Sequence, residues 1–158
     1  MLLDIKHIRE YLPEFRKSKK DRAYTHNEIQ SLLDITDDRF RTVILLLAST
    51  GLRIAIPDIQ LRNIEKVSVD PVVTIHKFTV YEGFNEEYIT FCTPECSNAI
   101  DNYLKMRERY GEKLNPNSYL IREQFDIRDP FTIPKCKKVK GNTLTRKLID
   151  LAERAGIR

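Results

Sequence analysis

The sequence predicts an α+β domain that is mostly helical and carries a small antiparallel sheet on one side. Apolar residues recur at helical spacing before residue 50 and again after residue 93. Between residues 67 and 92 this spacing gives way to short runs of β-branched and aromatic residues. The resulting order is helix, helix, antiparallel strands, helix, loop, helix, without an internal repeat or a low-complexity tract.

Two helices are predicted at the start of this order. Residues 4–12 form an amphipathic segment, and 1–22 read as an N-terminal helix followed by a basic linker. The main domain is predicted over residues 23–158. Its first helix opens on a capping box made by Thr25 and Glu28, and we expect Tyr24 and Ile29 to form a hydrophobic staple.

The next helix is predicted to be central because the run from Val43 to Ala48 is apolar almost all round. Asp37 or Asp38 suits its positive end, and Gly51 is a predicted stop. Pro57 then opens a short helical turn.

The β-rich runs are residues 72–75, 78–81 and 88–91, with a hairpin turn over 82–85. Two further helices complete the domain. The first runs from Pro94 to Tyr110, with Thr93 as its cap and Gly111 at its end, and the last runs from about Asn142 to Ala155.

Composition narrows the class of protein. The chain has 158 residues, of which 32% are charged and 41% hydrophobic, so a single domain with a true core is expected. No apolar run approaches the roughly 20 residues of a membrane span. Asp4, Lys6 and Arg9 make the N-terminus unlike a signal peptide, and a cytoplasmic location is the expectation.

The three cysteines, Cys92, Cys96 and Cys136, do not predict a disulfide framework. A structural zinc site needs about four ligands, and no histidine lies near them in the chain. We therefore expect no metal and no cofactor, with Cys92 and Cys96 packed at the base of the helix that Thr93 caps.

The net charge of +4 is distributed unevenly. One cluster lies within residues 16–22, and a second runs from residue 135 to 147 without an acid. Such patches on a near-neutral body are typical of surfaces that follow phosphates, so double-stranded DNA is a predicted partner. The candidate DNA-binding residues are Lys135, Lys137, Lys138, Lys140, Arg146 and Lys147.

The order of elements, together with Thr50-Gly51-Leu52-Arg53-Ile54, resembles the catalytic domain of tyrosine recombinases, the phage-integrase family. Residues 24–29 are similar to the family's domain-opening helix, and 91–95 to the entry of a later helix. Residues 151–158 are similar to the segment before the family's second catalytic box. The resemblance is to the N-terminal portion of that domain and is closest in style to archaeal integrase-like proteins.

This resemblance implies DNA integration and recombination through a transient phosphotyrosyl link, without metal or cofactor. It identifies Arg53 as the first catalytic arginine, whose planar fork would hold two phosphate oxygens. The family's His-x-x-Arg box and its tyrosine have no counterpart in these residues. Ile56 stands at a position where the family often has an acid. Glu82 stands where the hairpin lysine is expected, and Lys77 would fill that role only in another register.

We therefore expect a DNA-binding recombinase fragment that does not cleave and rejoin DNA alone. A second hypothesis is a module that competes with an intact recombinase for its sites. A third is a protein-interaction domain that uses an uncovered apolar face to bind a second copy or an intact recombinase. A metal-dependent nuclease, suggested by Pro57-Asp58, is disfavoured because no Glu-x-Lys or Asp-x-Lys triplet follows Asp58.

Overall fold

The computed structural model describes residues 22–52, 55–126, 128–129, 131–134 and 137–157. The predicted helix over residues 4–12 lies outside this part of the chain. So do Arg53, Lys135 and Cys136.

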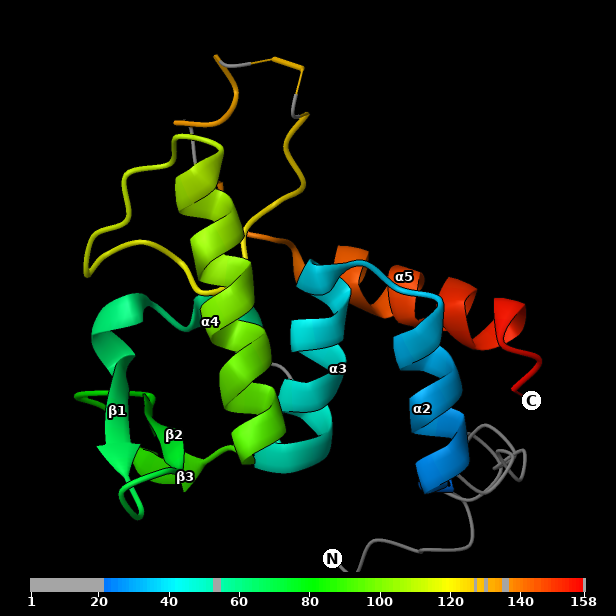
Figure 1. Ribbon diagram of the computed structural model, residues 1–158, viewed down its shortest axis with the longest axis horizontal. Helices are drawn as coiled ribbons and strands as arrows, with labels where there is room; N and C mark the ends of the chain where they lie inside the picture. Colours follow the sequence, from blue (N-terminus) through cyan, green and yellow to red (C-terminus); the bar gives the residue numbers. More distant parts are fainter. Residues whose placement is uncertain (1–21, 53–54, 127, 130, 135–136, 158) are drawn as a thin grey trace, which may run out of the picture.

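The α+β class is confirmed, with α4 lying between the sheet and α3 and with α2 beyond α3 (Figure 1). Helix α5 runs across the ends of these helices (Figure 1). The elements are α2 (His26–Asp34), α3 (Asp38–Thr50), the 3-10 turns η1 (Ile56–Asp58) and η2 (Leu61–Asn63), β1 (Ile64–Ser68), β2 (Thr74–Val80), β3 (Tyr88–Phe91), α4 (Pro94–Arg109) and α5 (Gly141–Arg154).

Helix ends follow local side-chain chemistry, as the sequence predicts. Thr25 and Glu28 form the capping box of α2. The Asp37 carboxylate accepts a hydrogen bond from the Phe40 amide at 2.8 Å and so caps α3. Helix α3 ends at Gly51, whose φ of 70° lies in the left-handed region that glycine adopts readily.

The sheet is antiparallel with the order β1-β2-β3. Two of the predicted β runs, 72–75 and 78–81, belong largely to one continuous strand, β2, because His76 and Lys77 complete its alternation of buried and exposed side chains. Strand β1 was not predicted. Its sequence carries little alternation, and its pairing with β2, which places Glu65 opposite Lys77, defines it.

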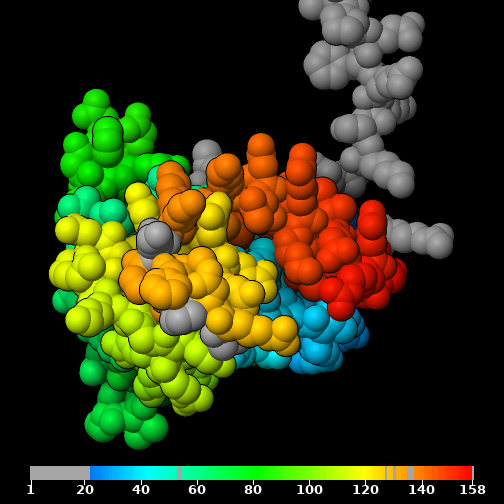
Figure 2. Space-filling view, turned by 90° about the horizontal axis from the view of Figure 1, so that it is seen from above, coloured from blue at the N-terminus to red at the C-terminus, as the bar shows by residue number. Residues whose placement is uncertain are grey.

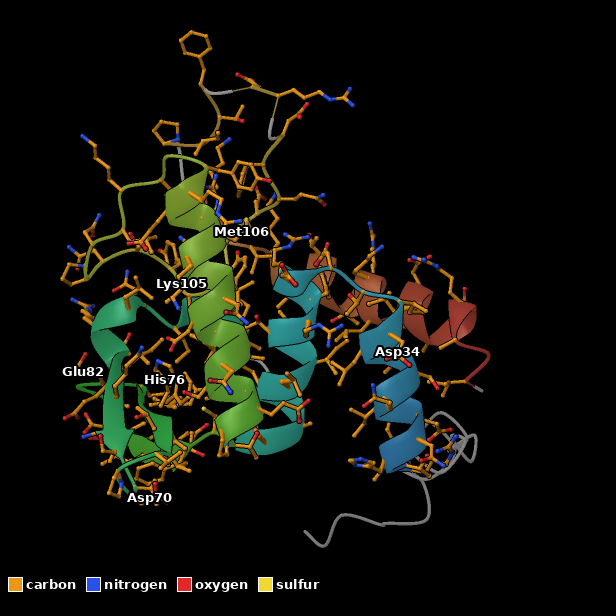
Figure 3. All side chains as sticks on the ribbon, in the orientation of Figure 1. Asp34, Asp70, His76, Glu82, Lys105 and Met106 are labelled. Atoms are coloured by element: carbon orange, nitrogen blue, oxygen red, sulfur yellow. The ribbon has the colours of Figure 1, made fainter. Side chains whose placement is uncertain are left out.

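A polar contact fixes the sheet to α4. His76 is buried between them (Figure 3), with its Nδ1 2.7 Å from the Ser97 Oγ. Its Nε2 lies 3.5 Å from the Asp101 Oδ1, and the Lys66 Nζ lies 2.8 Å from the other oxygen of the same carboxylate. Strands β1 and β2 are therefore both tied to one face of α4.

A second buried polar cluster lies at the far end of α4. The Arg107 guanidinium contacts both oxygens of Glu112, at 2.6 and 2.9 Å, and the Arg122 Nη1 lies 2.7 Å from the Glu112 Oε2. All three side chains are at most 3% exposed. Burial raises the pKa of the Glu112 carboxyl, but the hydrogen bonds and charges of Arg107 and Arg122 outweigh it, so the net pKa is lowered.

Candidate nucleic-acid interface

The basic stretch is anchored by its backbone and by one buried side chain. The Glu123 amide donates to the Lys137 carbonyl at 2.9 Å, and Arg122 pairs with Lys138 in an antiparallel bridge. The Val139 side chain is fully buried, whereas those of its basic neighbours are exposed. Residues 137–139 are thus fixed on the surface of the core.

Arg122 also holds the segment that precedes the basic stretch. Its Nη1 donates to the Ile133 carbonyl at 2.7 Å, and its Nη2 donates to the Thr132 carbonyl at 3.3 Å. The same guanidinium also binds the Glu112 carboxylate. It therefore links the backbone of Thr132 and Ile133 to the buried cluster at the end of α4.

The stretch comes close to the turn that follows the Thr-Gly-Leu-Arg motif. Lys138 forms an ion pair with Asp58 of η1. Pro57 of η1 and the first residues of α5, among them Gly141 and Thr145, line one shared cavity of about 360 Å³. The structure therefore joins two regions that the sequence analysis singled out separately, although Arg53 itself lies outside the described residues.

The predicted DNA-binding residues divide into paired and unpaired groups. Lys138 pairs with Asp58, and Lys147 lies 3.2 Å from Asp150. Within the described part of the chain, no carboxylate lies within ion-pair distance of Lys137, Lys140 or Arg146. Figure 2 shows the orange residues of this region along one face, between the green sheet and the red end of α5.

The positive end of α5 belongs to the same surface. Helix α5 begins at Gly141, and its N-cap, Lys140, makes no side-chain capping bond. The first amides of the helix and the lysine charge therefore add to one positive potential, which favours anions. Lys135, which completes the predicted set, lies outside the described residues.

The hairpin presents an acid where the family resemblance leads one to expect a lysine. The Glu82 carboxylate accepts a hydrogen bond from the Asn63 Nδ2 at 2.8 Å (Figure 3 labels Glu82). Lys77 instead pairs with Glu65 across β1 and β2, in the strand-surface role that the sequence favours. Glu82 also lines a cavity of about 360 Å³ together with Asp58 and Arg62.

Sequence reasoning missed Arg62. It belongs to η2, lies on the wall of the Glu82 cavity and is exposed to solvent. No motif marks it. The Gln60 and Asn63 side chains each accept a hydrogen bond from the backbone of the other residue and so shape η2, but these residue types are common in any loop.

No three His, Cys, Asp or Glu side chains converge as a metal site in the residues that the structure describes. Cys92 and Cys96 are both buried at the start of α4, where the sequence analysis expects them to pack. The hydrogen bond to Cys92, together with burial, raises the pKa of the Cys96 thiol, so this group is uncharged at neutral pH. In the described ranges, no helix has the length and apolar character needed to cross a membrane.

The fold has a counterpart among solved structures. The crystal structure of XerA recombinase superposes with a TM-score of 0.62 and 21% sequence identity, over 87% of this chain. The match spans 44% of the XerA chain, so this chain covers under half of that protein's length. No family model and no curated protein matches the sequence. The likeness is one of fold, and it agrees with the recombinase resemblance of the sequence motifs.

Proposed function

We propose that this chain is a recombinase-like domain that binds the backbone of duplex DNA through the face carrying Lys137, Lys140 and Arg146. The observation that carries the proposal is that these three cations, just before α5 and in its first turns, are exposed and have no ion-pair partner within the described residues. Unpaired surface cations are free to displace counterions from DNA. The XerA likeness in fold supports the same partner.

The family resemblance assigns a phosphate contact to Arg53, and the proposal keeps that role. Asp58, five residues further along the chain, forms an ion pair with Lys138, which lies between Lys137 and Lys140 in the sequence. The turn that follows the Thr-Gly-Leu-Arg motif therefore contacts the basic stretch, which supports one shared surface for a phosphodiester.

The 158 residues are expected to bind without cleaving. No histidine follows His76 in this sequence and no tyrosine follows Tyr119, so the resemblance assigns neither a nucleophile nor a second box. Glu82 on the hairpin adds a negative charge where the family has a lysine. An arginine without a nucleophile stabilises charge but forms no covalent link.

Salt dependence of binding tests the interface. For a labelled duplex of about 25 base pairs, log K should fall linearly with log salt, with a slope of about 0.9 per phosphate contact. The K137Q/K140Q/R146Q variant should reduce that slope by about 2 to 3. The matched control is K105Q/R109Q/K113Q, which removes the same charge from exposed positions. Lys105 and Arg109 lie in the last turns of α4, and Lys113 follows the helix.

A flat salt dependence of the wild-type chain would exclude the proposal. Equal losses in the two triple variants would reduce the effect to net charge alone. A nicked suicide duplex tests the claim that the chain binds DNA without cleaving it. A covalent protein–DNA adduct on a denaturing gel would contradict that claim.

A second candidate function is association with another protein chain. An apolar cavity of about 560 Å³ lies between α2, α3 and α5, and Tyr24, Leu47 and Leu148 are among its lining residues. Ile149 on α5 is 54% exposed. Sedimentation velocity measures this directly: a concentration-dependent dimer without DNA affinity would favour association over DNA binding.

A further inference from the structure

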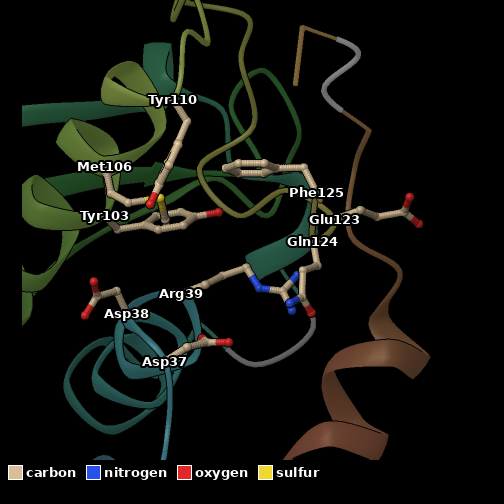
Figure 4. A pocket seen from close by; sticks show the side chains of 9 residues that line it. All are labelled: Asp37, Asp38, Arg39, Tyr103, Met106, Tyr110, Glu123, Gln124 and Phe125. Carbon is tan, nitrogen blue, oxygen red and sulfur yellow. The ribbon is translucent and has the colours of Figure 1, made fainter. Parts of the chain in front are cut away.

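Another cavity, of about 260 Å³, opens beside the first turn of α3. Its walls come from three segments: the start of α3, the last turns of α4, and residues 123–125 (Figure 4). The rings of Tyr110 and Phe125 meet edge to face there, with centroids 6.0 Å apart. Met106 completes an apolar wall.

The Tyr103 hydroxyl is an unsatisfied group in this cavity. Its side chain is 1% exposed, and its oxygen has no hydrogen-bond partner among the described residues. Figure 4 shows the hydroxyl directed into the space that Phe125 and Gln124 close on one side. Burial raises the pKa of this phenol, so at neutral pH it is an uncharged donor. Buried polar groups in native proteins nearly always have a partner.

Arg39 brings a buried guanidinium to the floor of the cavity, whose lining also includes Asp37, Asp38 and Glu123. Arg39 is 9% exposed, and in the described residues its guanidinium makes one hydrogen bond, to the Arg122 carbonyl at 3.1 Å, and no ion pair. Behind it, Arg107 and Arg122 bind the Glu112 carboxylate. The remaining N–H donors of the Arg39 guanidinium can therefore bind an added carboxylate.

We propose that this cavity binds a monocarboxylate with an aromatic or apolar body. The carboxylate accepts hydrogen bonds from the free donors of Arg39 and from the Tyr103 hydroxyl, and the apolar body packs against Tyr110 and Phe125. Asp37 and Asp38 at the mouth are exposed, and they repel a polyanion such as nucleic acid more strongly than a ligand with a single negative charge. The site adjoins the basic stretch, because the Glu123 amide donates to the Lys137 carbonyl, but its lining includes none of Lys137, Lys140 and Arg146.

The test uses 3-phenylpropionate as the probe and 3-phenylpropanamide as its uncharged control. In ¹⁵N-resolved NMR titrations of the full chain, the carboxylate should shift the amides of residues 37–40 and 123–125 in a saturable way. The amide should bind at least about tenfold more weakly, because it lacks the charge that Arg39 pairs with.

Two variants assign the donors. Tyr103→Phe should bind the probe about tenfold more weakly and yet melt at the same or a higher temperature, because the hydroxyl it loses is unsatisfied in the free protein. Arg39→Met should abolish binding, and if it fails to fold, Tyr103→Phe alone decides. Tyr88→Phe, at an exposed tyrosine on β3, is the matched control and should bind as the wild type does.

Equal binding of acid and amide would overturn the proposal, as would tighter binding of phenethylammonium, shifts at other residues, or no binding. N-acetyl-glycyl-phenylalanine distinguishes the two sources of such a carboxylate. Binding tighter than that of the free acid identifies a chain terminus of a protein, and weaker binding identifies a small metabolite. The K137Q/K140Q/R146Q variant should retain the site whether or not it binds DNA.

Discussion

The molecule uses cations in two opposite ways, at the end of α4 and along the stretch before α5. At the end of α4, Arg107 and Arg122 are buried, and each guanidinium binds a carboxylate and backbone carbonyls. In the basic stretch, Lys137 and Lys140 are exposed and unpaired within the described residues. Buried arginines act here as fixed crosslinks, whereas exposed lysines remain available to a ligand.

The largest test of this contrast is Glu112→Gln. It leaves the buried guanidinium groups of Arg107 and Arg122 without their carboxylate, and we expect a loss of about 3–5 kcal/mol in the free energy of unfolding. Urea denaturation measures it. Glu108→Gln, on the exposed face of α4, is the control and should stay within about 0.5 kcal/mol of wild type. A loss below about 1 kcal/mol for Glu112→Gln would show that the cluster is not a crosslink.

The same carboxylate predicts the shape of the stability curve at acid pH. Because the folded-state pKa of Glu112 is lowered from its ordinary value of 4.5, its contribution is complete above that value and is lost as pH falls through the folded pKa. The stability difference between wild type and Glu112→Gln should be constant above about pH 5 and shrink below pH 4.5. A difference that starts to shrink above pH 5 would mean that the pKa is raised instead.

The Arg122→Lys variant tests whether the planar guanidinium of Arg122 contributes to stability beyond its positive charge. A lysine ammonium cannot reach Glu112 and the carbonyls of Thr132 and Ile133 together, so we expect a loss of about 2 kcal/mol. Hydrogen exchange should show faster opening of residues 132–139 than in the wild type. Unchanged exchange in that segment would indicate that backbone pairing alone holds the basic stretch.

The smallest effect is expected for Lys138→Gln. Its ion pair with Asp58 has side chains that are 43% and 64% exposed, and such pairs contribute about 0 to 1 kcal/mol. Thermal denaturation should therefore barely change. A loss above about 2 kcal/mol would place Lys138 with the buried arginines rather than with the exposed lysines.

Local chemistry made most of the fold predictable. The Thr25 and Thr93 caps and the Gly51 stop depend on neighbours within four residues, and the helices begin and end at these positions. Strand β1 depends on pairing with β2, which no local pattern encodes. Charged residues usually predict an exposed position, so the buried cluster of Arg107, Glu112 and Arg122 was not predicted. One signal was present: Arg107 continues the buried stripe of Ile100 and Tyr103 at helical spacing.

The candidate site was predictable only in part. Runs of lysine are visible in any sequence, but the sequence does not show which of them are neutralised by Asp58 or Asp150. The cavity around Tyr103 draws on three segments that are far apart in the chain. Its unsatisfied hydroxyl is a property of packing and has no counterpart in composition or spacing.

The contact between His76 and Ser97 also bears on how the sheet assembles. If β2 slipped by one residue against α4, Ile75 or Lys77 would take the place of His76, and neither side chain presents a ring nitrogen to the Ser97 hydroxyl. A misaligned strand would thus trap the Ser97 hydroxyl and the Asp101 carboxylate without the imidazole between them. The polar contacts of the imidazole therefore favour the observed alignment of β2 against α4 over a shifted one.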